Sequence, residues 1–178
     1  LPLDMKDLSK KMTDRFLKFV KIYGHNLQMK IEPGRLLVGP SGILLSTVTN
    51  ITDTPKYRFV GVDTGFNHLI RPTMYGSHHK IINASSNFSI KKDVVIVGNI
   101  CESGDILSRS DGKIKRRLHS PKIGERIAFL DAGAYGYSMS SQYNLRPRPA
   151  EVLVKDGKSR LIRRAESFDD LTQCMLDF

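Results

Sequence analysis

The sequence predicts a mostly β fold with flanking helices, and three observations support this prediction. The first 24 residues have apolar positions at helical spacing. Beyond residue 35 the chain consists mainly of short apolar runs separated by Gly, Pro, Asn and Asp. Near the carboxyl end, an Asp-Gly pair stands between two such runs, which is the turn chemistry of a tight β-hairpin. One helix at each end is therefore expected to flank a β-domain.

The first predicted element is an amphipathic helix from residue 4 to about residue 23. Asp4 is a suitable N-cap, and Gly24 is a suitable stop at the carboxyl end. Apolar residues recur between them every three or four positions, at Leu8, Met12, Phe16 and Phe19. One face of this helix is expected to pack against another part of the protein.

A strand is predicted over 27–31, because apolar and polar residues alternate there and Pro33 and Gly34 then break the pattern. Glu32 follows at the carboxyl end of this strand. Barrels and open α/β sheets place their ligand-binding groups at that end. Taken alone, however, Glu32 is more simply interpreted as a surface glutamate.

The rest of the chain is predicted to form short strands and one last helix. The turn at 155–158 joins the last two strands into a hairpin. Ser167 is a suitable N-cap for a helix over 168–176, and Asp169 and Asp170 in its first turn interact favourably with the helix dipole. The predicted strands are 43–48, 57–62, 80–83, 94–97, 126–130, 151–154 and 159–162.

The composition is that of an ordinary globular protein. The chain has 178 residues, of which 40% are hydrophobic, and a mean hydropathy of −0.27, so it can bury a core. Its apolar runs are much shorter than a membrane helix needs. The first twenty residues carry charges throughout and lack the apolar centre of a signal peptide, so a cytoplasmic location is expected.

The net charge of +10 attracts anionic partners, but charge alone says little about fold or function. The densest basic run extends from Lys113 to Arg117 after Gly112, and it contains no aromatic residue to stack on bases. We interpret it as a loop of solvated charges and expect no nucleic-acid partner. No metal site is expected either, because no Cys or carboxylate cluster accompanies the neighbouring His78 and His79.

Two short blocks carry chemistry that packing alone does not explain. In 101–105, Cys101 lies beside Glu102 at a glycine-loosened turn, which pairs a thiol proton donor with a carboxylate that can hold an ammonium group. In 131–137, Tyr135 lies between glycines, where its ring and hydroxyl can meet a ligand. A role in the core is the simpler interpretation of two nearby candidates, Tyr137 and Cys174.

Five motifs occur in an order that resembles the family of diaminopimelate decarboxylases. The resemblance extends from about residue 32 to about residue 171, and the ordered set is far more specific than any single motif. The motifs are Glu32-Pro33-Gly34-Arg35, the block 69–76 from Leu69 to Gly76, the two blocks 101–105 and 131–137, and 146–153 from Arg146 to Leu153.

This resemblance implies a pyridoxal 5'-phosphate enzyme with an alanine-racemase-like (β/α)8 barrel and a carboxyl-terminal β-domain of the sandwich or barrel type. Residues 1–40 would be the last part of the cofactor-binding barrel, with its terminal helix and strand. Residues 41–178 would form the β-domain. In the family, the Schiff-base lysine and a glycine-rich phosphate loop precede the segment that matches residue 4 onward. The chain is therefore expected to be part of a longer enzyme.

The resemblance also implies roles for single residues toward the cofactor. Glu32 would pair with the pyridine nitrogen and so take part in catalysis. Gly34 would let its backbone approach the phosphate, and Arg35 would bind the phosphate or a substrate carboxylate. Tyr135 would contact the phosphate and border the substrate.

Toward the substrate, Arg71 and Tyr75 would grip the distal carboxylate, since residues four apart on a helical turn point the same way. Cys101, as the proton donor near the substrate α-carbon, and Glu102, as the carboxylate for the distal ammonium, would come from the second subunit of a homodimer with shared active sites.

The implied reaction is the decarboxylation of meso-diaminopimelate to L-lysine. A decarboxylase of a related basic amino acid is one alternative, although Arg35 and Arg71 favour a substrate with a second carboxylate. The other alternative is a truncated, non-catalytic relative that dimerises with a full enzyme or binds a polyanion. Catalysis is favoured by the intact set of site residues with functional side chains: Glu32, Arg35, Arg71, Tyr75, Cys101, Glu102 and Tyr135.

Overall fold

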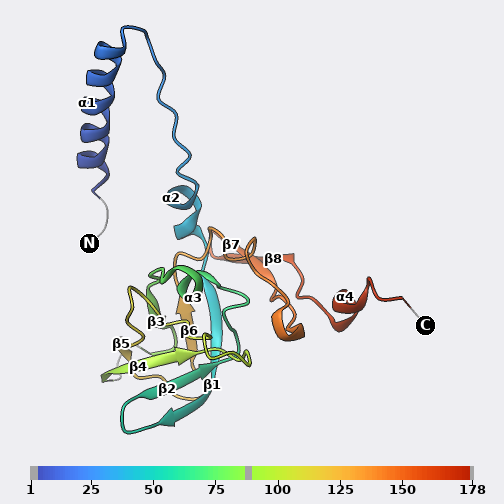
Figure 1. Cartoon of the computed structure of the whole chain (residues 1–178). Helices are drawn as coiled ribbons and strands as arrows, with labels where there is room; N and C mark the ends of the chain where they lie inside the picture. The colour runs from blue at the N-terminus through green and yellow to red at the C-terminus, as the bar shows by residue number, and fades with distance from the viewer. Residues whose placement is uncertain (1–3, 87–89, 177–178) are drawn as a thin grey trace. The chain divides into compact units, whose positions relative to one another are not determined.

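The computed structural model describes residues 4–86 and 90–176 (Figure 1). The chain divides into two compact units, of which one ends at Pro33 and the other begins at Gly34. Each unit is described by itself below. Within the described residues, no helix is both long and apolar enough to span a membrane.

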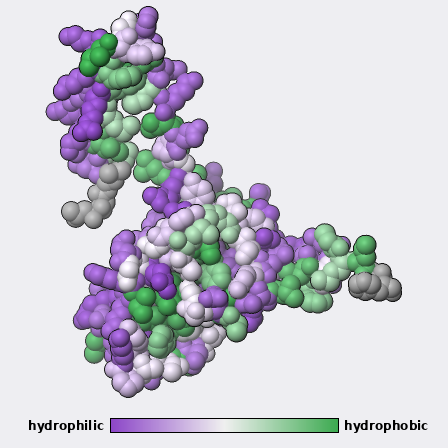
Figure 2. Space-filling model, viewed as in Figure 1, coloured by the Kyte–Doolittle hydropathy of each residue, from purple (hydrophilic) through white to green (hydrophobic). Residues whose placement is uncertain are grey.

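The first unit is dominated by helix α1 (Met5–Tyr23), which confirms the first predicted helix. The Asp4 carboxylate accepts hydrogen bonds from the backbone N–H groups of Lys6 and Asp7, and Gly24 ends the helix with a φ of +79°. No residue of α1 is buried. Apolar and charged residues therefore both reach its surface (Figure 2). The exposed apolar residues include Leu17, Phe19 and Ile22. Of the predicted apolar stripe, Leu8, Met12 and Phe16 are half-buried and Phe19 is exposed, so this unit does not fully cover the stripe.

The strand predicted over 27–31 is wrong. Residues 26–33 form neither helix nor strand, and Leu27, Met29 and Ile31 are exposed. A strand exists through hydrogen bonds to a neighbouring strand, and an alternating pattern cannot supply that neighbour. Glu32 accordingly follows an extended irregular segment rather than the end of a strand.

The second unit is built on a six-stranded sheet in the order β3-β6-β1-β2-β4-β5. The long strand β1 pairs with β6 through its first half and with β2 through its second half, with an irregularity in the β1–β2 register after Val48. The end strands β3 and β5 contact each other, so the sheet is a nearly closed barrel. The strands are β1 (Leu44–Asp53), β2 (Arg58–Val62), β3 (Ile81–Asn83), β4 (Lys91–Val97), β5 (Arg116–His119) and β6 (Arg126–Phe129).

The core lies between the inward-facing residues of these strands. Alternation along the strands places residues such as Val60 and Val62 of β2, and Val94 and Ile96 of β4, toward the interior of the barrel. This packing confirms the predicted β-domain. The fully buried members include Val48, Val60, Val62, Leu69, Val94, Ile96, Leu107, Ile127 and Phe129.

Strand β5 corrects the interpretation of the basic run as a loop. Arg116 and Arg117 belong to this strand, which pairs antiparallel with β4. Leu118 is its only buried residue, and the charged side chains around it hide the strand pattern. The backbone ladder to β4, which the sequence does not display, decides the structure here.

A separate hairpin and a short helix follow the barrel. Strands β7 (Glu151–Lys155) and β8 (Lys158–Arg163) meet at Asp156 and Gly157, whose φ angles of +52° and +72° confirm the predicted turn. Helix α4 (Phe168–Thr172) begins at Ser167 as expected, with a capping box to Asp170, but it ends four residues before the predicted end. Unpredicted elements are α2 (Gly34–Val38), η1 (Gly39–Ser41) and η2 (Tyr143–Leu145).

Candidate active site

Helix α3 (Arg71–Tyr75) carries a cation between two tyrosine rings. It is a single turn with Pro72 at its start and Gly76 as a left-handed cap. The guanidinium carbon of Arg71 lies 5.1 Å from the ring centre of Tyr75 and 5.0 Å from that of Tyr135. Both rings are exposed, so the cluster can be reached by a ligand. The structure thus brings together three of the predicted site residues.

Tyr135 reaches this cluster because the preceding chain makes a tightly packed bend. A side chain at Gly133 would put its Cβ 2.1 Å from the carbonyl oxygen of Val38, and one at Gly136 would put it 2.3 Å from that of Ala132. Tyr135 itself has a φ of +64°, an uncommon conformation for a residue with a side chain. The glycines flanking Tyr135 are therefore needed for close packing, and the tyrosine is held in a strained backbone.

The imidazole of His79, which interacts electrostatically with Arg71, is neutral. His79 is buried, and its Nδ1 donates to the carbonyl of Leu130 at 2.9 Å. Burial lowers the pKa of His79, and the positive charge of Arg71 acts in the same direction, although the hydrogen bond to Leu130 opposes them. His79 therefore adds no positive charge at neutral pH. Arg71 supplies the charge of the cluster.

The loop with Cys101 and Glu102 is anchored by a buried carboxylate. Asp105 accepts hydrogen bonds from the backbone N–H of Phe66 at 2.7 Å and of Ile100 at 2.9 Å. Gly65 and Gly98 lie so close to it that a Cβ on Gly98 would be 2.2 Å from the Asp105 carboxylate. Burial raises the pKa of Asp105, while the two N–H donors oppose the shift. Sequence reasoning placed Asp105 in the motif but missed this role.

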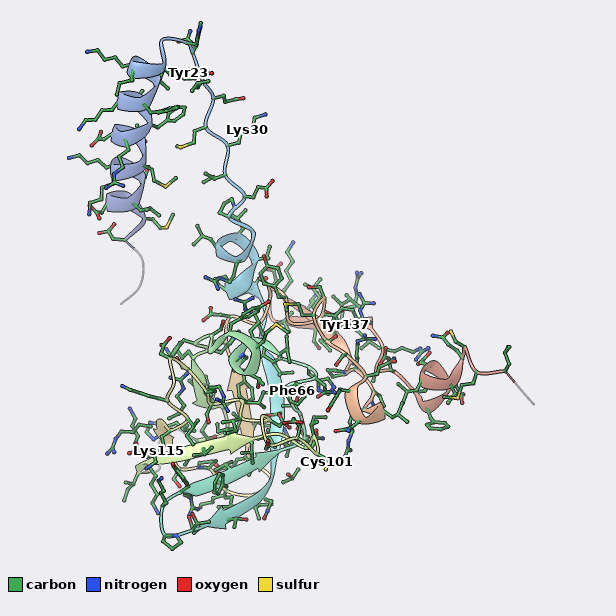
Figure 3. The ribbon with its side chains drawn as sticks, in the orientation of Figure 1. Tyr23, Lys30, Phe66, Cys101, Lys115 and Tyr137 are labelled. Atoms are coloured by element: carbon green, nitrogen blue, oxygen red, sulfur yellow. The ribbon has the colours of Figure 1, made fainter. Side chains whose placement is uncertain are left out.

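Cys101 and Glu102 themselves are exposed at the surface of the sheet unit, where Figure 3 labels Cys101. The Cys101 thiol is free, and its backbone N–H donates to the side-chain oxygen of Asn144 at 3.1 Å. The Glu102 carboxylate accepts from the N–H of Gly104 at 3.1 Å. The hydroxyl of Thr73 on α3 donates to the carbonyl of Gly104 at 3.0 Å, so this loop lies against the helix that carries Arg71.

Replacing Asp105 with alanine is expected to destabilise the protein by about 3 kcal/mol or more, because two backbone donors lose a charged acceptor in the interior. Urea denaturation of the wild-type and variant proteins measures this loss. Asp93→Ala is the matched control. Asp93 is exposed, and its ion pair with the exposed Arg117 is long, at 3.7 Å, so we expect this variant to lose less than about 0.5 kcal/mol of stability. Equal losses for both variants would contradict the anchoring role of Asp105.

The free energy of unfolding of the wild-type protein also depends on pH through Asp105. The direction of this dependence follows from the raised pKa of Asp105. A carboxyl group whose pKa is higher in the folded state favours folding below its unfolded pKa and loses that contribution as the pH rises through its folded value. Wild-type stability therefore contains a component that falls from about pH 4 upward. Asp105→Asn is expected to remove this component from the pH profile.

The other predicted residues lie on the irregular segment and α2. Glu32 is exposed in the first unit, and Gly34 and Arg35 begin the second. Among the described residues, nothing lies within 4 Å of a Cβ built on Gly34, and its φ needs no glycine. The chain itself thus gives no reason for a glycine there, which leaves room for the close approach of an external group. Arg35 is exposed on α2.

These residues fit a bound pyridoxal phosphate by donor type. Its phosphate needs N–H, O–H or guanidinium donors, which the open backbone at Gly34, the exposed Arg35 and the exposed phenol of Tyr135 offer. Its pyridine nitrogen needs a carboxylate, and the exposed Glu32 carries one.

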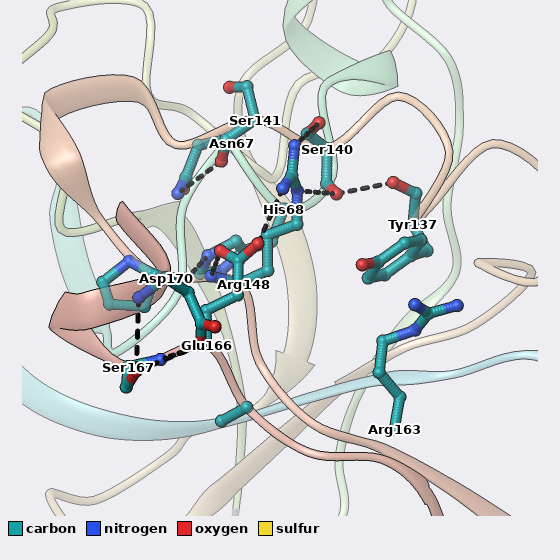
Figure 4. A network of polar contacts seen from close by, with 12 residues as sticks. Asn67, His68, Tyr137, Ser140, Ser141, Arg148, Arg163, Glu166, Ser167 and Asp170 are labelled. Carbon is teal, nitrogen blue, oxygen red and sulfur yellow. Dashed lines mark hydrogen bonds and ion pairs between the residues drawn. The ribbon is translucent and has the colours of Figure 1, made fainter. Parts of the chain in front are cut away.

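A polar network that the sequence did not predict holds the barrel to the segment after η2 (Figure 4). Nε2 of His68 lies 3.0 Å from the carbonyl of Pro147 and therefore carries the proton, so Nδ1 accepts from the hydroxyl of Thr64 at 2.9 Å. Burial lowers the pKa of His68, which keeps this neutral tautomer. The half-buried pair of Arg148 and Glu166 lies in the same network. Only contacts between distant segments reveal these residues.

Two minor interpretations are wrong. Tyr137 is not a core aromatic: it is exposed, and Arg163 lies over its ring at 4.0 Å. Cys174 is exposed rather than buried, because α4 ends before it and packs no core around it.

Comparisons with known proteins can now be added to this geometry. The sequence model of the family described as "Pyridoxal-dependent decarboxylase, C-terminal sheet domain" matches residues 18–133. The diaminopimelate decarboxylases of Methanothermobacter thermautotrophicus and Aquifex aeolicus are 45% and 40% identical to the chain, over 96% and 99% of its length. Each match covers 39% of the relative, so the chain spans about two fifths of the length of these curated relatives.

A solved structure agrees with these relatives. The diaminopimelate decarboxylase from M. jannaschii in complex with L-lysine is 36% identical to the chain and superposes with a TM-score of 0.81. The superposition covers 97% of this chain and 38% of that one. Together with the nearly closed barrel, the matched sequence model shows that this chain belongs to the family of pyridoxal-dependent decarboxylases and contains their C-terminal sheet domain.

Proposed function

We propose that this chain is part of a longer pyridoxal-phosphate enzyme that decarboxylates meso-diaminopimelate to L-lysine. The observation that carries the proposal is the Arg71 guanidinium between the exposed rings of Tyr75 and Tyr135, on a helix hydrogen-bonded to the Cys101–Glu102 loop. The names of the relatives support the substrate. In this proposal, residues 1–40 are the last part of the cofactor-binding (β/α)8 barrel and residues 41–178 are the β-domain.

The cofactor would be held by groups from both parts. Glu32 would pair with the pyridine nitrogen, while Gly34, Arg35 and Tyr135 would bind the phosphate. When bound, pyridoxal phosphate supplies an electron sink for the carbanion that remains as carbon dioxide leaves. The exposed α1 face and the irregular segment 26–33 would obtain their packing partners from the rest of the barrel.

The chain's own residues would orient the substrate and complete the reaction. Arg71 is a planar cation that can bind the distal carboxylate through two hydrogen bonds, and Tyr75 limits its movement by stacking. Glu102 would bind the distal ammonium. The Cys101 thiol would donate a proton to the α-carbon from which carbon dioxide has departed, so that a C–H bond replaces the broken C–C bond.

Cys101 and Glu102 would act on the substrate held by the other subunit of a homodimer. Their exposure at the surface of the sheet unit is consistent with this role, since an active site shared between subunits needs such residues at the interface. The cytoplasm is the compartment that we expect for this biosynthetic reaction.

The test uses the full-length protein with pyridoxal phosphate and meso-diaminopimelate. Equal amounts of carbon dioxide and L-lysine are expected, with L-ornithine and L-lysine as poor substrates because they lack the distal carboxylate that Arg71 would bind. Faster decarboxylation of L-ornithine or L-lysine would support the related basic amino acid instead. A folded, cofactor-loaded protein that releases no carbon dioxide from any of the three would favour the non-catalytic relative.

A further inference from the structure

Arg148 joins two segments of the sheet unit that are distant in sequence. Its terminal nitrogen donates to the Glu166 carboxylate at 2.7 Å, and its backbone N–H donates to the other oxygen of that carboxylate at 2.7 Å. On the opposite side, Nε donates to the Ser140 hydroxyl at 3.0 Å and the second terminal nitrogen to the Ser140 carbonyl at 3.2 Å. One guanidinium therefore connects the segment after β8 to the turn that ends at Ser140 (Figure 4).

Burial makes this connection firm. The Arg148 and Glu166 side chains are 26% and 18% exposed, whereas the arginines of the neighbouring ion pairs, Arg163 and Arg164, are 51% and 66% exposed. Partial burial raises the pKa of Glu166, but the hydrogen bonds from Arg148 lower it more, so this pKa lies below its usual range. The Glu166 backbone N–H also donates to the Arg148 carbonyl at 3.0 Å. Glu166 thus fixes the position of the guanidinium from one side.

The turn on the other side of Arg148 is the one that carries Tyr135. The Ser140 hydroxyl and N–H both donate to the Tyr137 carbonyl, at 2.5 and 2.9 Å, and the N–H of Met139 donates to the Tyr135 carbonyl at 3.3 Å. Tyr135 is the strained residue of this turn, with its φ of +64°. A strained conformation persists only where the surrounding contacts determine it.

We infer that Arg148 is a positioning residue for Tyr135: by holding Ser140 against Glu166, it keeps the turn in the conformation that places the Tyr135 ring over Arg71. This inference rests on the proposed role of Tyr135 at the cofactor phosphate. Arginine is needed because its fixed fork of donors reaches Ser140 and Glu166 at once, whereas the single ammonium of lysine cannot reproduce both contacts.

The hairpin β7–β8 adds a second support to the same turn. Arg163 on β8 lies over the Tyr137 ring at 4.0 Å, and the guanidinium carbon of Arg148 lies 5.9 Å from the same ring. The pairing of Arg163 with Glu151 on β7 holds Arg163 in place. The Tyr135 turn is thereby tied to the segments on both sides of the hairpin.

The first experiment measures amide hydrogen exchange in the full-length holoenzyme carrying Arg148→Lys. Amides of residues 136–141 are expected to exchange about tenfold faster or more, because local opening of the turn becomes easier. Arg164→Lys is the matched control: it is the same change near the same end of the chain, but the Arg164 guanidinium pairs with Asp170 instead of with Ser140. Unchanged exchange at 136–141 in Arg148→Lys would overturn the inference.

The second experiment asks whether Arg148 acts through Tyr135. We expect Arg148→Lys to weaken pyridoxal phosphate binding about tenfold, and to weaken it no further when Tyr135 is already alanine. Equal weakening in both backgrounds would overturn the inference. If Tyr135→Ala alone left cofactor binding unchanged, the proposed role of Tyr135 would fail, and hydrogen exchange would still decide whether Arg148 holds the turn.

Ser140→Ala provides a milder variant in case Arg148→Lys does not fold. It removes the hydroxyl that accepts from Arg148 Nε and donates to the Tyr137 carbonyl, so it breaks the side-chain link between Arg148 and the turn but leaves the pair of Arg148 with Glu166 intact. Both the exchange rate at 136–141 and the dissociation constant of pyridoxal phosphate are expected to rise, by smaller factors than in Arg148→Lys. Values equal to wild type in both measurements would count against the inference.

Discussion

Replacing Arg71 with methionine is expected to lower kcat/KM for meso-diaminopimelate by at least about thirtyfold, mostly through a higher KM. Removing one partner of a desolvated charge pair costs at least about 2 kcal/mol, which corresponds to that factor. The distal carboxylate is remote from the bond that breaks, so its contact with Arg71 is similar in the ground state and the transition state. Loss of such uniform binding raises KM more than it lowers kcat.

Two further variants separate charge from geometry at Arg71. Arg71→Lys keeps the positive charge but loses the planar group that stacks between Tyr75 and Tyr135, so an intermediate KM is expected. Arg117→Met is the control, because Arg117 is an exposed arginine on β5 with only a 3.7 Å contact to Asp93. Steady-state kinetics with meso-diaminopimelate give both constants. A wild-type KM in Arg71→Met would remove Arg71 from substrate binding.

The elements that could be predicted are those whose signals are local. The helix α1 is fixed by Asp4 and Gly24, which supply the hydrogen bonds at its two ends, and the hairpin turn by Asp156 and Gly157, which tolerate positive φ. The contact of Arg71 with Tyr75 also follows from their spacing on one turn of helix. In each case the deciding interaction joins residues a few positions apart.

The elements that were missed depend on partners elsewhere in the chain. Strand β5 exists because β4 pairs with it, although Leu118 alone faces the core. The segment 26–33 has the alternation of a strand but no strand beside it. In the site, the anchoring of the Cys101 loop by Asp105 and the link of Arg148 to Ser140 both join segments that no periodicity relates. The glycines around Tyr135 singled it out as a ligand contact, but its role at the cofactor phosphate came only from the resemblance to a family.

The proposed site has two halves, the Arg71 cluster and the Cys101 loop, which are distant in sequence. Within one sheet unit, the Arg71 cluster and the Cys101 loop are neighbours through the hydrogen bond of Thr73 to Gly104. A shared active site nevertheless requires that Cys101 and Glu102 serve the substrate bound by the other subunit. Adjacent surfaces on one chain can meet both requirements when a two-fold axis passes close to them, because each subunit then presents the same surface to its partner.

Mixing two impaired variants is expected to restore about a quarter of the wild-type activity, assayed at a substrate concentration below KM, if the active site is shared in this way. Arg71→Met disables the site that its own subunit builds, and Cys101→Ala disables the site of the partner. After random subunit exchange, about half of the dimers are mixed, and each mixed dimer contains one intact site and one doubly altered site. Decarboxylation of meso-diaminopimelate is measured before and after unfolding and refolding the mixture. The control mixes Arg71→Met with Tyr75→Ala, which both disable the site of their own subunit and should restore nothing. No recovery in the test mixture, like the control, would place Cys101 in the site of its own subunit.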